Sequence, residues 1–425
     1  MKSLLDKINA KLNAQGGFLK AVSVLVGGTA FAQLIGFLCL PILTRLYTPE
    51  DYSILGVYIA IVSIFAVISC LRFDIAIPIA IDNNEARNIF YLALISNIIF
   101  SIIILISILF FYEYISNIEI IRRLSFWVWL IPLGIFLNGL YSALQFWATR
   151  NKKFKLIANT RITQALFSNA TSMGLAIYGL GFAGLILGQL LSYSGGILKL
   201  FYNAVNNKEN TNIILKETFL KYKNFPKYST WEGLANTSAI QLPLIIIAIF
   251  LVGPDVGYIM LAIKVLGIPM GLIGSAISQV YLSNAALEYK KNNLLFYTKD
   301  TVNRVFKIVF FPFLILFLLS KYIFVYIFGN NWGGVGLYIM IMIPWYFMQI
   351  LSAPISMSLH IVNEQRKSLF IQFLGFIFRV FGLFLFCVYV KDYAIYFYAL
   401  SGFVFYLAYI LYVYYILKEK ENNLI

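Results

Sequence analysis

The chain has 425 residues, of which 61% are hydrophobic and only 12% are charged, and its formal net charge is +15. Because water-soluble helices need a polar face, this balance excludes a water-soluble fold. The positive charge does not by itself indicate nucleic-acid binding, since its distribution matters more than its sum in a membrane protein. We therefore expect no nucleic-acid partner.

Apolar segments recur along the whole chain, each long enough to cross roughly 30 Å of hydrocarbon. The first predicted spans are 18–43, 52–71, 88–112, 125–148, 157–178 and 182–203. The second set is 230–252, 256–286, 308–328, 335–359, 368–390 and 393–416. The sequence thus predicts an all-α integral membrane protein with twelve transmembrane helices.

The polar connections between these spans alternate in basic content. One set carries most of the 33 Lys and Arg residues, whereas the opposite set holds only Arg45, Arg122, Arg123 and Lys391. By the positive-inside rule, both chain ends are predicted to be cytoplasmic. The outward connections, such as 179–181 and 391–392, are short. Short outward loops argue against a polymerase or ligase acting on lipid-linked sugars.

A weak internal repeat suggests two halves. Pro49 and Pro254 coincide at an offset of 205 residues, and each is followed by an acidic residue at the start of a predicted span. Pro41 and Pro243 interrupt the two preceding spans. Paired repeats with interrupted helices are typical of transporters, although two apolar segments can also be similar by chance. The predicted organisation is a six-helix lobe over 1–203, a cytoplasmic linker over 204–229 and a second six-helix lobe over 230–425.

Glycine pairs spaced by four residues occur in two of the spans. Gly184 and Gly188 form one such pair, and Gly267 and Gly271 form another. Small residues at this spacing let helices approach closely in a membrane, and we interpret both pairs as packing positions.

Two basic residues fall near the middle of predicted spans. Lys264 lies in IMLAIKVLGIPMG and Arg379 in GFIFRVFGLFLF. A charge at the bilayer centre costs roughly 2.5–3.5 kcal/mol on insertion scales, so each side chain is expected to face a protein interior or a water-filled cavity. The alternatives are a structural salt bridge or a side chain that extends toward the interface.

Acidic residues and catalytic groups are scarce by comparison. Glu232 begins the seventh span, where it either pairs with a cation of the cavity, carries a coupling proton or stabilises the helix start through the dipole. Arg72 and Asp74 form either a local ion pair or a charged rim at the cytoplasmic mouth. The single histidine, the absence of a Walker A pattern and the absence of metal-ligand spacing predict no catalytic site, cofactor or metal.

The sign of the membrane charges separates two classes of cargo. An exporter of organic cations needs carboxylates within its spans, and this sequence has almost none at span centres. Central Lys and Arg residues instead favour a phosphate or diphosphate.

The segment FAQLIGFLCLPILTRLYTPEDYSILGVYIAIVSIFAVISCLRFDIAIPIA (31–80) resembles the Wzx-type O-antigen flippases. These belong to the polysaccharide-export branch of the multidrug/oligosaccharidyl-lipid/polysaccharide flippase superfamily. Their pattern of a proline, an arginine and a P-E-[ED]-[YF] turn is matched by Pro41, Arg45, Pro49, Glu50, Asp51 and Tyr52. The signature R-[YF]-D-x-A-I is matched from Arg72 to Ile77, and GLGFAGLILGQLLS (179–192) resembles a further helix turn of the family.

The resemblance implies two six-helix lobes around a central cationic cavity. It also implies that an undecaprenyl-diphosphate-linked oligosaccharide moves from the cytoplasmic to the periplasmic leaflet of a bacterial inner membrane. The expected mechanism is alternating access, with H+ or Na+ as a possible coupling ion. The expected partners are this lipid-linked cargo, membrane lipids and other glycan-assembly membrane proteins.

The predicted anion contacts are Arg45, Arg72, Lys264 and Arg379, with Asp74 and Glu232 as partners, gates or ion-coupling groups. Two alternatives stay open. One is a multidrug-type cation antiporter of the same superfamily, and the other is a membrane-embedded glycan polymerase or transferase.

Overall fold

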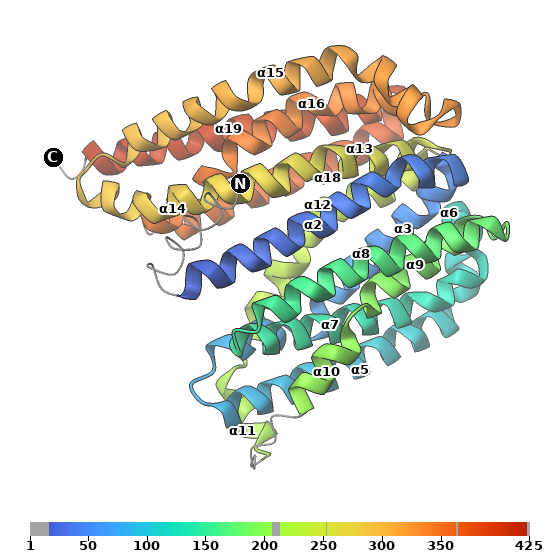
Figure 1. Ribbon diagram of the computed structural model, residues 1–425, viewed down its shortest axis with the longest axis horizontal. Coiled ribbons are helices and arrows are strands. Elements are labelled where there is room, and N and C mark those ends of the chain that lie inside the picture. Colours follow the sequence, from blue (N-terminus) through green and yellow to red (C-terminus); the bar gives the residue numbers. More distant parts are fainter. Residues whose placement is uncertain (1–16, 206–212, 252, 363, 423–425) are drawn as a thin grey trace, which may run out of the picture. The chain divides into compact units, whose positions relative to one another are not determined.

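The structure, a computed structural model, describes residues 17–205, 213–251, 253–362 and 364–422. These residues form helices and turns, with no strand among them (Figure 1). A chain surrounded by hydrocarbon has to satisfy its backbone N–H and C=O groups internally, and α-helices do this within one segment. The predicted all-α membrane fold class is confirmed.

The chain divides into two compact units. The first contains the described residues up to Tyr47 together with Val57–Gln241, and the second contains Thr48–Gly56 and the residues from Leu242 onward. The division thus cuts two helices and leaves 204–229 within the first unit. The assignment of 1–203 and 230–425 as separate lobes stays a prediction.

The first unit is built from long helices joined by short helical turns. They are α2 (Gly17–Leu46), α3 (Pro49–Ser69), α4 (Phe73–Ala76), η1 (Ile77–Ile79), α5 (Asn83–Ile115), α6 (Glu119–Leu124), η2 (Ser125–Leu130), α7 (Ile131–Arg150), α8 (Phe154–Ile177), α9 (Phe182–Ser194), α10 (Ile197–Val205), α11 (Leu215–Lys221), η3 (Phe225–Ser229) and α12 (Thr230–Phe250). Helix α8 packs against both α2 and α9.

The second unit takes the first turns of α3 and the last part of α12, and adds the remaining helices. These are α13 (Asp255–Pro269), η4 (Met270–Gly274), α14 (Ser275–Lys290), α15 (Leu294–Phe328), η5 (Asn330–Trp332), α16 (Val335–Ser352), η6 (Pro354–Met357), α17 (Ser358–Ile361), α18 (Gln365–Tyr389), η7 (Lys391–Tyr393) and α19 (Ala394–Asn422). Helices α15, α16 and α19 lie side by side (Figure 1).

Ten helical segments of the described chain are long and apolar enough to cross a membrane. Two of the predicted spans are not among them. Helix α8, predicted as 157–178, has sufficient length but carries Lys155, Arg161 and several amide side chains. The span predicted as 256–286 is divided by the π-helical turn η4 into α13 and α14, which have 15 and 16 residues.

The two segments of the internal repeat pack against each other in the second unit. Ser53 of α3 accepts a hydrogen bond from the Gly257 N–H of α13 (2.8 Å) and donates one to the Gly253 carbonyl (3.1 Å). A Cβ atom at Gly257 would overlap the carbonyl oxygen of Pro49 and lie 2.8 Å from its carbonyl carbon. The repeat therefore marks a close crossing of two helix starts.

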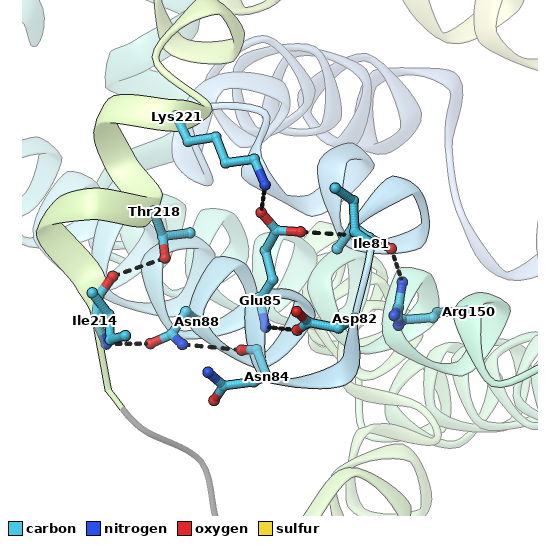
Figure 2. A network of polar contacts seen from close by, with 10 residues as sticks. Ile81, Asp82, Asn84, Glu85, Asn88, Arg150, Ile214, Thr218 and Lys221 are labelled. Carbon is cyan, nitrogen blue, oxygen red and sulfur yellow. Dashed lines mark hydrogen bonds and ion pairs between the residues drawn. The ribbon is translucent and has the colours of Figure 1, made fainter.

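Helix α11, in the predicted linker, is bound to the start of α5. Figure 2 shows the Ile214 N–H donating to Asn88 Oδ1 (2.9 Å) and Lys221 paired with Glu85. The Phe219 ring also packs on Phe73, with centroids 5.8 Å apart. The hydrogen bond to Glu85 raises the pKa of Lys221 above its ordinary value of 10.5. This part of the linker is a docked element.

A second ion cluster joins the start of α18 to the end of α19. Lys420 Nζ lies 2.6 Å from Glu364 Oε1, and Lys367 Nζ lies 3.3 Å from Glu419 Oε2. The hydrogen bond from Lys420, aided by the charge of Lys367, lowers the pKa of Glu364 below its ordinary value of 4.5. A carboxyl group whose pKa is lower in the folded than in the unfolded chain stabilises the fold at pH values above the pKa that it has in the unfolded chain.

We expect Glu364→Gln to lower the unfolding temperature of the purified protein at pH 7. This difference from wild type should shrink as the pH falls below 4.5 and through the folded-state pKa, because protonation then removes the same ion pair from wild type. Thermal unfolding in detergent across this range measures it. Glu113→Gln is the control, because Glu113 is exposed and forms no ion pair within the described chain. A difference independent of pH would contradict the assignment.

Candidate functional site

Lys264 lies on α13 and is partly buried in the second unit. Its Nζ lies 5.2 Å from the centroid of the Tyr52 ring, and Trp332 packs edge-on against that ring at 5.0 Å. The salt bridges between described residues do not include Lys264. The ammonium group is therefore held by an aromatic face, and the alternative of a structural salt bridge is not found.

Arg379 has the same kind of environment on α18. Its Cζ lies 4.4 Å from the Trp345 ring centroid and 5.9 Å from that of Tyr398. The two rings belong to α16 and α19 and meet edge-on at 5.2 Å. No described carboxylate pairs with Arg379. Its guanidinium group is thus stacked on aromatic rings contributed by two neighbouring helices.

The aromatic contacts offset only part of the cost of placing these charges in a membrane. A cation on an aromatic face gains about 2 kcal/mol when desolvated. The insertion cost of Lys or Arg at a helix centre is roughly 2.5–3.5 kcal/mol, and a buried donor without a partner adds about 1–3 kcal/mol. Arg379 Nε is such a donor. Both sites therefore retain an uncompensated positive charge that an anion would stabilise.

Arg72 and Asp74 lie where the chain turns from α3 into α4. Leu71 and Arg72 have positive φ values of 48° and 60°, a left-handed conformation that ends α3. Asp74 is only 5% exposed, and its Oδ2 accepts a 2.6 Å hydrogen bond from Ser142 of α7. Its Oδ1 is buried without a hydrogen-bond partner. The local Arg72–Asp74 ion pair, one of the two alternatives, is not formed in the described structure.

Glu232 and Arg45 lie at helix ends and are exposed. Glu232 is in the first turn of α12 and Arg45 in the last turn of α2, the two positions where their charges are favoured by the helix dipole. Arg72 Nε lies 3.3 Å from the position of a Cβ atom on Gly233, so α4 and the start of α12 adjoin. Arg72, Asp74 and Glu232 thus belong to one region of the first unit, while Lys264 and Arg379 lie in the second.

One pocket within the second unit has a volume of about 380 Å³. Its polar lining includes Asp255, Tyr338, Lys391 and Asp392. None of the six predicted site residues lines it. Groups of three or more metal-ligating side chains are absent from the described residues.

Sequence reasoning missed the partners of the predicted charges. Each of the partners Tyr52, Trp345, Tyr398 and Ser142 lies on a different helix from the charge that it contacts, so spacing alone does not reveal them. An excess of aromatic residues, 17% of the chain, is the one signal that points to ring contacts for cations. Arg161 was also missed. It donates to Gln145 Oε1 (2.8 Å), while its Nε is buried without a partner.

Comparison with known families gives one match that covers most of the chain. The model of a family described as polysaccharide biosynthesis protein matches residues 42–335. No curated protein sequence matches the chain.

Solved structures with a similar fold are membrane transporters. The lipid II flippase MurJ in an inward closed conformation has a TM-score of 0.74 and 14% identity, covering 93% of this chain and 87% of its own. An inward-facing multidrug resistance MATE family transporter of the MOP superfamily has a TM-score of 0.67 and 16% identity, covering 91% and 96%. A MOP superfamily transporter from Pyrococcus furiosus Vc1 (DSM3638), described as having a binding pocket of reverse polarity, has a TM-score of 0.55 and 14% identity, covering 94% and 98%. At these identities the likeness shows the fold.

Proposed function

The chain belongs to the polysaccharide biosynthesis protein family, and from this premise we propose that it is a flippase for lipid-linked polysaccharide repeat units. The cargo is an undecaprenyl-diphosphate-linked O-antigen unit, which moves from the cytoplasmic to the periplasmic leaflet of a bacterial inner membrane. The membrane-transporter fold supports this proposal over an enzyme that acts on sugars.

One observation carries the choice of cargo: Lys264 and Arg379 keep uncompensated positive charges within membrane helices. A diphosphate that leaves water loses hydration, and fixed cations offset part of that loss. Lys264 and Arg379 contact the diphosphate during its passage. Arg45 and Arg72 attract it near the two mouths of the path. The polyprenyl tail stays in lipid.

Direct measurement of flipping tests the proposal. The purified chain, reconstituted in liposomes that contain undecaprenyl-diphosphate-linked oligosaccharide in the inner leaflet, should expose the sugar to an external lectin. Empty liposomes and liposomes with an unrelated membrane protein serve as controls. In cells, loss of the gene should leave the completed lipid-linked unit on the cytoplasmic leaflet. Normal appearance of the unit on the periplasmic leaflet would contradict the proposal.

Asp74 and Glu232 act in gating or in coupling to H+ or Na+. The support for Asp74 is its burial with one unpaired carboxylate oxygen, because a buried charge without an ion pair is costly and a bound cation would stabilise it. We expect Asp74→Asn to keep thermal stability, since the amide oxygen still accepts the Ser142 hydrogen bond, and to abolish stimulation of transport by an ion gradient. Flipping with and without an imposed H+ or Na+ gradient measures this. Unchanged stimulation would remove Asp74 from the coupling role.

The MATE-like fold favours a second candidate, an antiporter of organic cations. Such a transporter needs carboxylates in its span centres, whereas the described span centres in this chain carry Lys264 and Arg379. Ethidium efflux from cells that express the chain discriminates the two functions. Efflux without any flipping would favour the antiporter.

A further inference from the structure

The pocket at one end of the second unit contains none of the residues to which the proposed function assigns a role. It forms where α12 and α18 end and where α13, α16 and α19 begin, and its volume is about 380 Å³. Pockets that bind small organic molecules usually measure about 300–1,000 Å³. The pocket therefore has room for a small solute. The predicted topology places it on the outward side, because its lining includes the outward connection 391–392.

Charged side chains without an ion-pair partner line this pocket. Asp255, Lys391 and Asp392 are among its lining residues, and none of them belongs to a salt bridge between described residues. Asp255 Oδ1 accepts a hydrogen bond from the Tyr338 hydroxyl, which positions this carboxylate at the pocket wall. Lys391 and Asp392 are exposed. Because two carboxylates face one ammonium group, the lining offers hydrogen-bond acceptors and a donor but repels a phosphate.

The rest of the lining is apolar or aromatic. Leu251 and Ile341 contribute aliphatic side chains, and Tyr396 contributes a ring that is still 48% exposed. The Tyr338 ring beside it is buried and packs on Tyr258, with centroids 5.2 Å apart. An exposed aromatic ring next to carboxylates suits a molecule that has an apolar face and a polar edge.

A pyranose sugar has this distribution of polar and apolar groups. Its hydroxyl groups lie around the edge of the ring and can donate to carboxylates, while the C–H groups of one face can pack on an aromatic side chain. A metal ion fits less well, since groups of three or more metal-ligating side chains are absent from the described residues. A phospholipid headgroup would bring its phosphate beside Asp255 and Asp392.

We propose that this pocket is a saccharide site that binds an uncharged sugar from the outward side. Sugar binding requires no transport, so it can be measured by itself. The assignment of this sugar to the cargo rests on the proposed function, in which the pocket receives the glycan after it has crossed the membrane.

Saturation-transfer NMR on the purified full chain, in a detergent without a sugar headgroup, tests the site. The probes are the methyl glycosides of glucose, galactose, mannose and N-acetylglucosamine, and the oligosaccharide released from the lipid-linked intermediate of the cell that makes the protein. We expect saturable binding of at least one probe. The affinity should fall about tenfold in Asp392→Asn, which loses a charge-assisted hydrogen bond, and in Tyr396→Leu, which loses the ring. Tyr396→Phe keeps the ring and should bind within about twofold of wild type.

Two control substitutions remove similar groups outside the pocket lining. Tyr326→Leu removes a tyrosine of α15 that is 83% exposed, and Glu113→Gln removes an exposed carboxylate of α5. Both should bind the probes like wild type. Thermal unfolding in the same detergent checks that each variant is folded. Absence of saturable binding of every probe to wild type, or equal affinities for wild type, Asp392→Asn and Tyr396→Leu, would overturn the proposal.

Further results separate this site from the transport proposal. If flipping fails while the probes still bind, the transport proposal falls and the saccharide site stands. If wild type flips the lipid-linked unit and Tyr396→Leu slows this several-fold, the bound sugar belongs to the cargo. Binding of glycerophosphoethanolamine without binding of any saccharide would assign the pocket to a lipid headgroup and overturn the proposal.

Discussion

Lys264→Gln lowers the rate of flipping by about 10- to 100-fold, and Lys264→Ala does the same. The reason is the loss of one charge-assisted contact to the cargo, worth about 1.5–3 kcal/mol. If the contact forms mainly in the transition state of passage, each 1.36 kcal/mol corresponds to a tenfold rate change. Lys264→Arg should retain most activity, because the cation and its Tyr52 ring contact are preserved.

The measurement is flipping in liposomes, normalised to the amount of inserted protein. Lys321→Gln is the matched control, because Lys321 is an exposed lysine of α15. Tyr52→Leu should cause a smaller, several-fold loss, since the ammonium group remains but loses the ring that positions it. Wild-type rates for Lys264→Gln would remove Lys264 from the transport path.

Gly257→Ala destabilises the second unit by about 3 kcal/mol, combining overpacking of 1–3 kcal/mol with a weakened hydrogen bond. The new Cβ atom would overlap the Pro49 carbonyl oxygen, a backbone atom that cannot rotate away. Relief requires α3 and α13 to separate, and this breaks the bond between Ser53 and the Gly257 N–H.

A glycine-to-alanine substitution at Gly267, which also lies on α13, provides the control. Among the described residues, no heavy atom beyond the adjoining backbone of α13 lies within 4 Å of a Cβ atom at Gly267, so Gly267→Ala should be neutral or should stabilise α13 by up to about 1 kcal/mol through its helix propensity. Thermal unfolding in detergent, followed by size-exclusion chromatography, compares the two variants. Equal unfolding temperatures would show that the crossing at Gly257 is looser than described.

Much of the fold could be predicted because hydrocarbon imposes a simple rule on sequence. Spans with few polar residues, such as α5 and α16, follow directly from hydropathy. Helix α8 and the α13–α14 segment are harder, because buried polar side chains and a π-helical turn weaken their apolar signal. The glycine pairs were interpreted correctly only in part. Gly188 approaches the Ser168 carbonyl closely, whereas a Cβ atom at Gly267 would meet no neighbouring helix among the described residues.

The candidate site was less accessible from sequence. The cost of membrane charge singles out Lys264 and Arg379 without any knowledge of the fold. Their partners depend on how helices pack, so Tyr52 and Trp345 emerge only from the structure. For Asp74, the sequence suggests a partner that the structure does not bear out. Its sequence neighbour Arg72 is the obvious partner, but the left-handed turn between α3 and α4 leaves Asp74 bound to Ser142 instead.

The ring-held cations also make the protein sensitive to membrane voltage. An ion pair carries no net charge, so a helix that moves it along the membrane normal does no electrical work. The partners of Lys264 and Arg379 are neutral rings, which do not cancel the positive charge of either side chain. A charge displaced through a potential of 100 mV exchanges about 2.3 kcal/mol with the field. Any conformational change that shifts α13 or α18 across the bilayer is therefore biased by the potential even before cargo binds.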